Sequence, residues 1–349
     1  MNTSAKACII FGGCGYVGRQ WQRRLAGQKR FDRIIVADLQ PPRADALPGT
    51  EFCRCDVRRP LAPQLPPVAP EWLFNFAAVH REPGHAREEY FDTNVAGARH
   101  ICSYAEHSGC RNILFTSSIA VYGPTSGATS ESSPLYPASP YGISKLCAEL
   151  IQEVWQRAAS DRRLCICRPG VIYGPGDPGN ILRMIRAVKK GYFFFPGSRN
   201  LRKSYGYIEG LLDSFEFMLA RPEPRLTCNY VEQKTETLGT LVRIVQEHLG
   251  KKRPVLTAPL PLLEAVAALA QLVTAGRSPL HPVRVRKTAM STHIVPETLL
   301  QSGFHFRYDF AASLHDWARK APEDFYGNPK TSQPQKNARP RLQPRPAPE

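Results

Sequence analysis

The chain has few cysteines and no long apolar run. Cysteine accounts for 10 of 349 residues, too few for a secreted domain held by disulfides, so reduced thiols in the cytoplasm are the better match. No stretch reaches the ~18 uninterrupted apolar residues of a membrane span, because Glu264 and Gln271 interrupt the longest candidate, 259–276. The apolar stretch 7–11 is too short for a signal-peptide core. These absences predict a cytoplasmic protein without a membrane span.

Acidic residues are also scarce, at 30 Asp and Glu against 46 Lys and Arg, which gives a net charge of +16. Residues 327–349 contain six prolines, five basic residues and one acidic residue, a composition typical of a disordered tail. The other basic residues are scattered and form no stripe interleaved with aromatics, which argues against nucleic-acid binding. An anionic small-molecule substrate is the simpler partner. No metal site is predicted.

Short β-branched runs alternate with amphipathic stretches through the first half of the chain. The predicted buried strands lie at 7–11, 33–37, 51–55, 72–76, 112–116 and 164–168. The predicted helices between them lie near 17–26, 89–108 and 141–159. This alternation predicts repeated βαβ units, and therefore an α/β fold with a doubly wound parallel sheet.

The pattern loosens in the second half. Helices are expected at 180–190, 208–220, 237–249 and 310–320, with a loop rich in Gly, Pro and Arg at 196–204. We divide the chain into a sheet domain at 1–175, a smaller substrate lobe at 176–326 and the tail at 327–349, with core elements returning to the sheet from the second half. The apolar stretch 260–275 is expected to be an ordinary packing helix. The alternative is a cover for an apolar substrate.

A glycine-rich segment follows the first predicted strand and opens the first helix. Glycines there permit a tight turn and a close approach of the backbone to a pyrophosphate at the positive helix end. Asp38 ends the second strand, 20 residues after Gly18, where a carboxylate can accept hydrogen bonds from ribose hydroxyls. A carboxylate repels a 2′-phosphate, which favours NAD over NADP, although Arg33 and Arg43 keep NADP open. At the end of the third strand, Asp56 can meet an adenine amino group or simply face solvent.

Tyr141 and Lys145 are four residues apart in a predicted helix, so their side chains share one face. The pKa of a phenol is ordinarily ~10, and a nearby ammonium group lowers it by stabilising the phenolate. A tyrosine in that setting can act as a general base near neutral pH. The hydroxyl of Ser118, just after the fifth strand, can bridge the substrate oxygen and Tyr141.

Six short motifs follow one another in order along the chain. They are GGCGYVG at 12–18, NFAA at 75–78, TNVAG at 93–97, TSS at 116–118 with VYG at 121–123, YGISK at 141–145 and RPGVIYGP at 168–175. In these motifs the sequence resembles the extended short-chain dehydrogenase/reductases, in particular the NAD-dependent epimerase/dehydratase family acting on nucleotide sugars. The resemblance extends across residues 7–320.

The resemblance implies a Rossmann domain that holds NAD, with Ser118, Tyr141 and Lys145 as the catalytic residues. Tyr141 would exchange a proton with the substrate hydroxyl while NAD takes the hydride, and Lys145 would hold the nicotinamide ribose and lower the pKa of Tyr141. Asn94 would support the active-site loops. The remaining cofactor contacts are expected from Gly12, Gly15, Tyr16, Val17, Gly18, Asp38, Asp56, Val57, Ala77 and Ala78.

Two departures from the family pattern narrow the expected reaction. Sugar 4,6-dehydratases of this family place an Asp-Glu pair directly after the catalytic hydroxyl, where this chain has Ile119 and Ala120. Dehydration is therefore disfavoured. Nucleotide-sugar epimerases usually carry an Asn after the sixth strand, where this chain has Val171, and that difference weakens the nucleotide-sugar assignment.

Basic residues in the second half provide candidate contacts for a substrate diphosphate. Asn180 and Arg183 lie at the start of a predicted helix, whose backbone N–H groups favour an anion. Lys203 belongs to the basic loop 199–203, in a region where relatives keep a phosphate-binding Arg. Arg284, or its neighbour Arg286, is the third candidate.

Three functions remain open on sequence grounds. The leading hypothesis is a sugar-nucleotide 4-epimerase, which oxidises C4 and returns the hydride to the other face. The alternatives are an NAD(P)-dependent sugar or hydroxysteroid-type dehydrogenase or ketoreductase, and a non-catalytic NAD-binding scaffold. A homodimer is expected through helices 89–108 and 141–159, because the second has more apolar positions than one core-facing stripe requires.

Overall fold

A seven-stranded parallel sheet forms the centre of the computed structural model, which describes residues 6–42, 47–82, 84–125, 127–177, 179–274, 285 and 289–326. The strand order is β10-β6-β5-β4-β1-β2-β3, the doubly wound arrangement that the alternating pattern predicts. The strands are β1 (Ala7–Phe11), β2 (Arg33–Asp38), β3 (Thr50–Arg54), β4 (Pro70–Asn75), β5 (Asn112–Thr116), β6 (Arg163–Pro169) and β10 (Arg225–Tyr230). β10 adds to the sheet from the second half of the chain.

Both faces of the sheet are buried, and successive side chains of a strand serve opposite cores. Cys8 and Ile10 of β1 belong to one hydrophobic cluster, whereas Ile9 and Phe11 belong to another. This follows from the two-residue period of a strand, which sends neighbouring side chains to opposite faces. Near-continuous apolar runs therefore predict a sheet covered on both sides.

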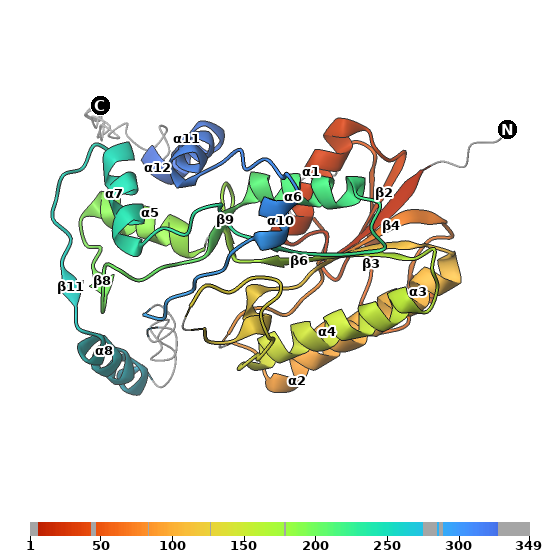
Figure 1. Ribbon diagram of the computed structural model, residues 1–349, viewed down its shortest axis with the longest axis horizontal. Coiled ribbons are helices and arrows are strands. Elements are labelled where there is room, and N and C mark those ends of the chain that lie inside the picture. Colours follow the sequence, from red (N-terminus) through yellow and green to blue (C-terminus); the bar gives the residue numbers. More distant parts are fainter. Residues whose placement is uncertain are drawn as a thin grey trace, which may run out of the picture.

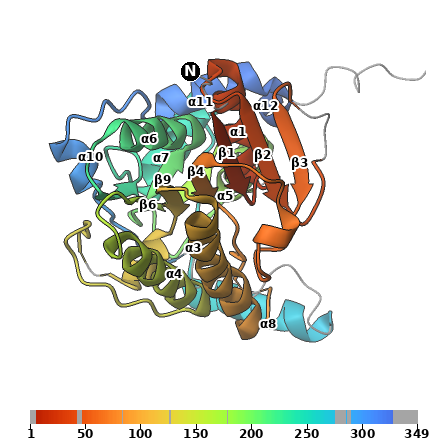
Figure 2. The same ribbon diagram turned by 90° about the vertical axis from the view of Figure 1, so that its right-hand side faces the viewer.

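Helices cover the two faces, as Figures 1 and 2 show. α1 (Tyr16–Gln28) and α6 (Ile208–Ala220) lie on one face, where Trp21 contacts Phe215 edge to face at 5.5 Å between ring centroids. α3 (Ala96–Ser108) and α4 (Pro140–Arg157) lie together on the other face. No helix in the described ranges is both long enough and apolar enough to cross a membrane.

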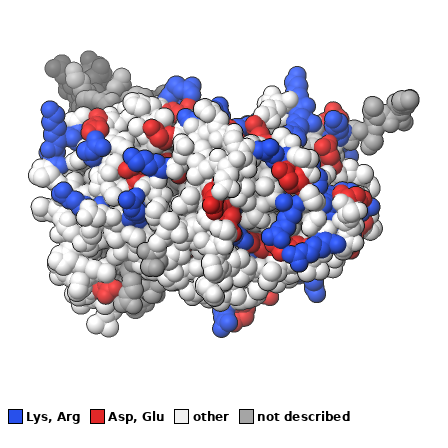
Figure 3. Space-filling model, in the orientation of Figure 1, with Lys and Arg blue, Asp and Glu red and all other residues white. Residues whose placement is uncertain are grey.

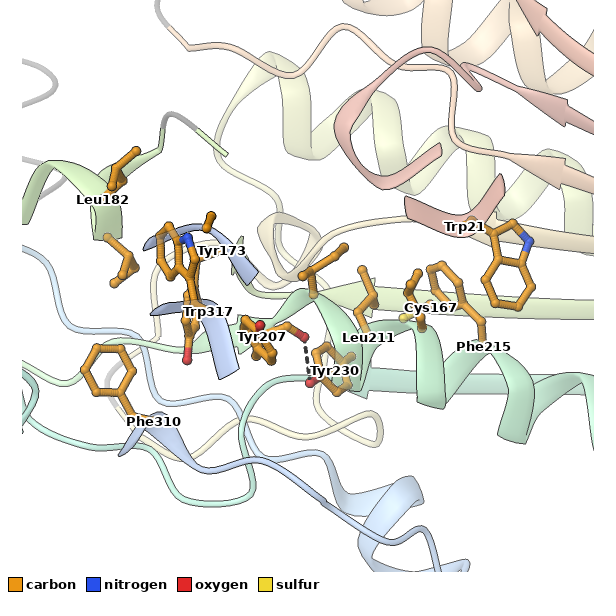
Figure 4. Close-up of a cluster of buried hydrophobic side chains, with 14 of the residues drawn as sticks. Trp21, Cys167, Tyr173, Leu182, Tyr207, Leu211, Phe215, Tyr230, Phe310 and Trp317 are labelled. Carbon is orange, nitrogen blue, oxygen red and sulfur yellow. Dashed lines mark hydrogen bonds between the residues drawn. The ribbon is translucent and has the colours of Figure 1, made fainter. Parts of the chain in front are cut away.

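The second half of the chain builds a lobe beyond the carboxyl ends of the strands (Figure 1). Its helices are α5 (Asn180–Lys190), α7 (Leu238–His248), α8 (Leu260–Val273), α11 (Phe310–Lys320) and α12 (Pro322–Tyr326), whereas α10 (Glu297–Gln301) packs against β10 of the sheet. Its short parallel strand pairs are β7 (Val171–Tyr173) with β9 (Tyr205–Tyr207), and β8 (Phe195–Pro196) with β11 (Thr257–Ala258). Figure 4 shows the lobe core, with Tyr173, Tyr207 and Trp317, continuing into the sheet core at Phe215 and Trp21.

Three sequence-based expectations about these elements were wrong. β3 is the edge strand and is largely exposed, with Phe52 facing solvent, because it has a neighbour on only one side. The single helix expected at 89–108 is divided into α2 (Arg87–Tyr90), a π-helical turn (Phe91–Val95) and α3. α8 forms where an apolar packing helix was expected, but Ala267 is its only buried residue.

A buried ion pair connects α4 to the sheet. Arg168 of β6 donates two hydrogen bonds to Glu149 of α4, at 3.0 and 2.6 Å, and both side chains are almost fully buried. Arg168 also donates to the hydroxyl of Tyr122 at 3.0 Å, and that hydroxyl donates to Asn229 at 2.7 Å. The guanidinium and carboxylate groups are thus paired inside the protein, which is the condition under which buried charges are tolerated.

We expect Glu149→Ala to lower the free energy of unfolding by about 3–5 kcal/mol, because it leaves the Arg168 charge buried without its partner. Glu51→Ala is the matched control. It removes the exposed partner of Arg33 on the sheet edge, where such a pair contributes about 0–1 kcal/mol. Urea denaturation of both variants measures the difference, and equal losses would show that the buried pair has no special role.

Candidate active site

The glycine-rich segment forms a cradle between β1 and the start of α1. Gly12 has a φ of +70°, and a Cβ there would lie 2.6 Å from the backbone nitrogen of Ala77, so only glycine fits. Gly15 is exposed at the N-cap of α1, whose first N–H groups lack partners within the helix. Tyr16 and Val17 begin that helix and are half-buried. The cradle fits a dinucleotide pyrophosphate, which needs a close, positively polarised backbone.

Asp38 lies at the end of β2, beside the cradle. One carboxylate oxygen accepts a hydrogen bond from the backbone N–H of Cys14 at 2.9 Å, and the other accepts from Gln40 at 3.2 Å. A carboxylate has about four acceptor sites, so two bonds leave capacity for the hydroxyls of a ribose. The position is the one expected for a residue that selects NAD over NADP.

The carboxylate of Asp56 lies at the end of the next strand and pairs with its neighbour Arg58 at 2.7 Å. Hydrogen bonds from the Arg58 guanidinium lower the pKa of Asp56. Val57 is buried, and its carbonyl is 2.8 Å from a ring nitrogen of His100. Asp56 thus braces its own loop, and its contact with adenine stays a prediction.

Asn94 connects the loop after β4 to α4. Its amide oxygen accepts from the backbone N–H of Val79 at 2.9 Å, and its amide nitrogen donates to the hydroxyl of Ser144 at 2.8 Å. The loop that it holds begins with Ala77 and Ala78, both half-buried beside Gly12. Asn94 lies in the π-helical turn, a distortion that is frequent at functional sites.

Tyr141 and Ser118 meet where α4 packs against the turn after β5. Ser139 caps α4, accepting from the N–H of Gly142 at 3.2 Å, so Tyr141 falls in the first turn. A Cβ on Gly142 would lie 2.5 Å from the carbonyl oxygen of Ala120, so glycine lets the helix approach that turn closely. Burial raises the pKa of Tyr141 to about 12 and Glu82 raises it as well, whereas the hydrogen bond with Ser118 lowers it.

Lys145 follows Tyr141 by one helical turn and is almost fully buried. Its ammonium nitrogen lies 4.3 Å from the ring centroid of Phe115, a favourable cation–π contact. Burial lowers the pKa of Lys145 to about 7, and the carboxylate of Glu149, one turn further along, opposes that shift. That a protonated Lys145 stabilises a Tyr141 phenolate stays a prediction.

Three of the four candidate substrate contacts lie among the described residues, in two parts of the chain. Asn180 and Arg183 lie in the first turn of α5, where the Asn180 amide oxygen accepts from Arg183 at 2.8 Å. Lys203 precedes β9 and donates to the carbonyl of Met290, and burial lowers its pKa to about 8. Arg284 lies outside the described residues. The role of each in binding substrate stays a prediction.

Sequence reasoning missed the contribution of Glu149. Its position four residues after Lys145 places both on one helix face, and Arg168 interrupts an apolar strand. A charged residue inside a buried strand indicates a buried partner, so these two signals together could have identified the pair. Among the described residues, no cluster of His, Cys, Asp and Glu could hold a metal ion.

The sheet order, the glycine cradle and the Ser118, Tyr141 and Lys145 group define a dinucleotide-dependent enzyme of the Rossmann type. The model of the NAD dependent epimerase/dehydratase family matches residues 8–229, so the chain belongs to that family and is an enzyme of the extended short-chain dehydrogenase/reductase type. The N-acetyl-alpha-D-glucosaminyl-diphospho-ditrans,octacis-undecaprenol 4-epimerase of Escherichia coli O157:H7 is 30% identical over 243 residues, which are 68% of this chain and 73% of that protein.

Solved structures share the fold across nearly the whole chain. The Bordetella bronchiseptica enzyme WbmG in complex with NAD is similar with a TM-score of 0.70 at 19% identity, covering 93% of this chain and 96% of that one. The UDP-glucuronic acid 4-epimerase of Bacillus cereus in complex with NAD also has a TM-score of 0.70, at 16% identity, covering 93% and 99%. At these identities the likeness establishes the fold.

We expect Asp38→Ala to weaken NAD binding and to reduce the preference for NAD over NADP. The variant removes an acceptor for the ribose hydroxyls and the charge that repels a 2′-phosphate, each worth about tenfold or less. The dissociation constants of both dinucleotides, measured by calorimetry, give the ratio. A ratio equal to that of the parent would mean that Asp38 only braces the cradle.

Proposed function

We propose that the chain is an NAD-dependent 4-epimerase of a nucleotide sugar. The observation that carries the proposal is the hydrogen bond between Ser118 and Tyr141 at the carboxyl edge of the sheet, with Lys145 one helical turn further along α4. The glycine cradle lies at the same edge. Ligands of open α/β sheets bind outside the carboxyl ends of the strands. A sugar held at this edge would lie between the cofactor cradle and the lobe.

The cradle and Asp38 would hold NAD, which would supply the acceptor and then the donor of a hydride. Tyr141 takes the proton of the substrate hydroxyl as a general base and returns it in the second half of the cycle. Ser118 donates a hydrogen bond to the same substrate oxygen. Lys145, one helical turn from Tyr141, would stabilise the phenolate when it is protonated.

Inversion at C4 is favoured over elimination of water. Ile119 and Ala120 occupy the turn after Ser118, and neither can supply the acid and base that a 4,6-dehydratase needs there. The relatives from Escherichia coli and Bacillus cereus described above are both named as 4-epimerases. A one-way dehydrogenase is the competing function, and it would release its reduced cofactor rather than recycle it.

A sugar diphosphate attached to a polyprenol is a second candidate substrate. The Escherichia coli relative is named for such a molecule. The observation that favours it in this chain is α8, which exposes large apolar side chains where a water-soluble substrate needs none. The same Tyr141 and Lys145 chemistry applies to either diphosphate, because the reacting C4 hydroxyl belongs to the sugar.

The ten cysteines are all unpaired, and we infer from this that the enzyme works in the reducing cytoplasm. We also infer a homodimer through α3 and α4. Leu150 and Val154 of α4 are exposed one helical turn apart, which is typical of a face that meets a partner.

We expect Tyr141→Phe to lower kcat by about 10²–10⁴-fold, the usual contribution of general acid–base catalysis. NAD affinity should stay near that of the parent, since the ring that packs against the site is retained. Steady-state turnover of UDP-glucose and other UDP-sugars, together with NAD binding, measures both. Turnover close to that of the parent would exclude Tyr141 as the base.

For the dimer, we expect Leu150→Glu to give monomers at micromolar concentration in light scattering, because two like charges would face each other across a two-fold interface. Glu153→Gln, on the same helix, is a control that introduces no charge. A parent that is monomeric at all concentrations would exclude the interface, and a dimer unaffected by Leu150→Glu would place it on another surface.

A further inference from the structure

Helix α8 turns its apolar side away from the protein. Four large apolar residues at spacings of four, three and four line one face of the helix: Leu262, Val266, Leu269 and Val273. Leu269 is 60% exposed and Val273 is 76% exposed. A helix on a protein surface in water normally buries such a stripe against the core. The exposed stripe therefore indicates that α8 packs against an apolar partner other than the core of this chain.

The polar residues of α8 lie on the opposite side. Glu264 and Gln271 are seven residues apart, about two helical turns, and both are half-buried on the side of the buried Ala267. The helix thus presents leucine and valine to solvent and keeps its carboxylate and amide toward the protein. This arrangement is the reverse of the one that hydration favours.

The strand pair that leads into α8 extends the apolar surface. Phe195 of β8 pairs with Thr257 of β11, so the exposed side chains of Phe194 and Leu256 come from adjacent positions of the two strands. α8 follows β11 directly and lies close to β8, since a Cβ on Gly197 would be 3.8 Å from the Cβ of Leu260. Figure 1 shows this end of the lobe projecting from the body, and Figure 3 shows it almost without charged side chains outside the grey atoms.

The sequence on both sides of α8 is basic. Lys251, Lys252 and Arg253 are exposed in the segment that precedes β11. The sequence 275–288 adds four basic residues and no acidic residue, while Glu264 is the only acidic residue of α8. In sequence, an apolar helix followed directly by basic residues is typical of a segment that lies on an anionic lipid surface, with its apolar side at the acyl boundary.

We propose that α8 seats the enzyme on an anionic lipid bilayer, with the stripe Leu262, Val266, Leu269 and Val273 in the boundary between headgroups and acyl chains. Fourteen residues give a helix of roughly 21 Å, shorter than the ~30 Å apolar thickness of a bilayer. The helix therefore lies along the surface and does not cross it.

The docking does not depend on the proposed reaction, although it would bring the site to the layer that holds a lipid-linked sugar diphosphate. The test uses the full-length protein without NAD or substrate. Sedimentation with vesicles of phosphatidylglycerol and phosphatidylcholine is compared with sedimentation with phosphatidylcholine alone. We expect binding to the anionic vesicles that weakens with added salt.

Leu269→Gln should weaken vesicle binding about tenfold, the effect of withdrawing one leucine from an apolar environment. Leu300→Gln, at an exposed leucine of α10, is the matched control and should bind as the parent does. Absence of vesicle binding by the parent, or equal binding by the parent and Leu269→Gln, would overturn the proposal. So would a parent oligomer that Leu269→Gln dissociates, since α8 would then cover a second copy.

Turnover of a soluble UDP-sugar by the same two variants separates the docking from the reaction. We expect both variants to turn over the soluble substrate as the parent does, which also shows that they are folded. Vesicle binding without turnover would leave the docking standing and reject the proposed reaction. Turnover without vesicle binding would reject the docking and leave the proposed reaction standing.

Discussion

The ion pair between Glu149 and Arg168 determines where α4 lies on the sheet, and the candidate active site depends on that placement. Lys145 precedes Glu149 by one helical turn, and Tyr141 precedes it by two. A helix held at Glu149 therefore carries both side chains to fixed positions at the carboxyl edge. Because both charges are buried, any other placement of α4 would leave one of them unpaired.

The same carboxylate also acts on Lys145 through the local field. Burial disfavours the charged form of Lys145 and so lowers its pKa, and a neutral amine does not stabilise a phenolate. Glu149 opposes that effect, so one residue contributes both to the position of the helix and to the protonation of its lysine. The parallel sheet brings the cofactor cradle to the same place, because the glycine cradle and the turn after β5 both follow strands that end at one edge.

Most of the fold could be predicted from local patterns. β1 and β5 begin and end where the apolar runs do, since a strand buried on both faces has a continuous apolar signal. The edge position of β3 could not be predicted in this way, because the run at 51–55 does not reveal how many neighbours the strand has. The π-helical turn at Asn94 and the outward face of α8 depend on tertiary contacts and surroundings that no local window contains.

In the candidate site, too, local sequence patterns predict some features, and others depend on tertiary contacts. Ser118, Tyr141 and Lys145 are predicted from motif and helical spacing, and their catalytic role stays a prediction, although Ser118 and Tyr141 share a hydrogen bond. Asp56 was identified by its position at a strand end, but position alone could not show that Arg58 pairs with it. Two sequence signals pointed to Glu149, namely its spacing from Lys145 and the charged Arg168 inside an apolar strand, and the structure shows that Glu149 and Arg168 pair.

The central claim is that C4 is inverted within one site, where bound NAD would accept the C4 hydride and return it to the other face while Tyr141 takes and returns the hydroxyl proton. UDP-glucose carrying deuterium at C4, incubated with the enzyme in ordinary water, tests it most directly, with UDP-N-acetylglucosamine and UDP-glucuronic acid labelled in the same way as further substrates. The account predicts the C4 epimer of at least one of these sugars with the deuterium retained at C4, as mass spectrometry would show. Loss of the label to water, or the absence of epimer from all three, would contradict it.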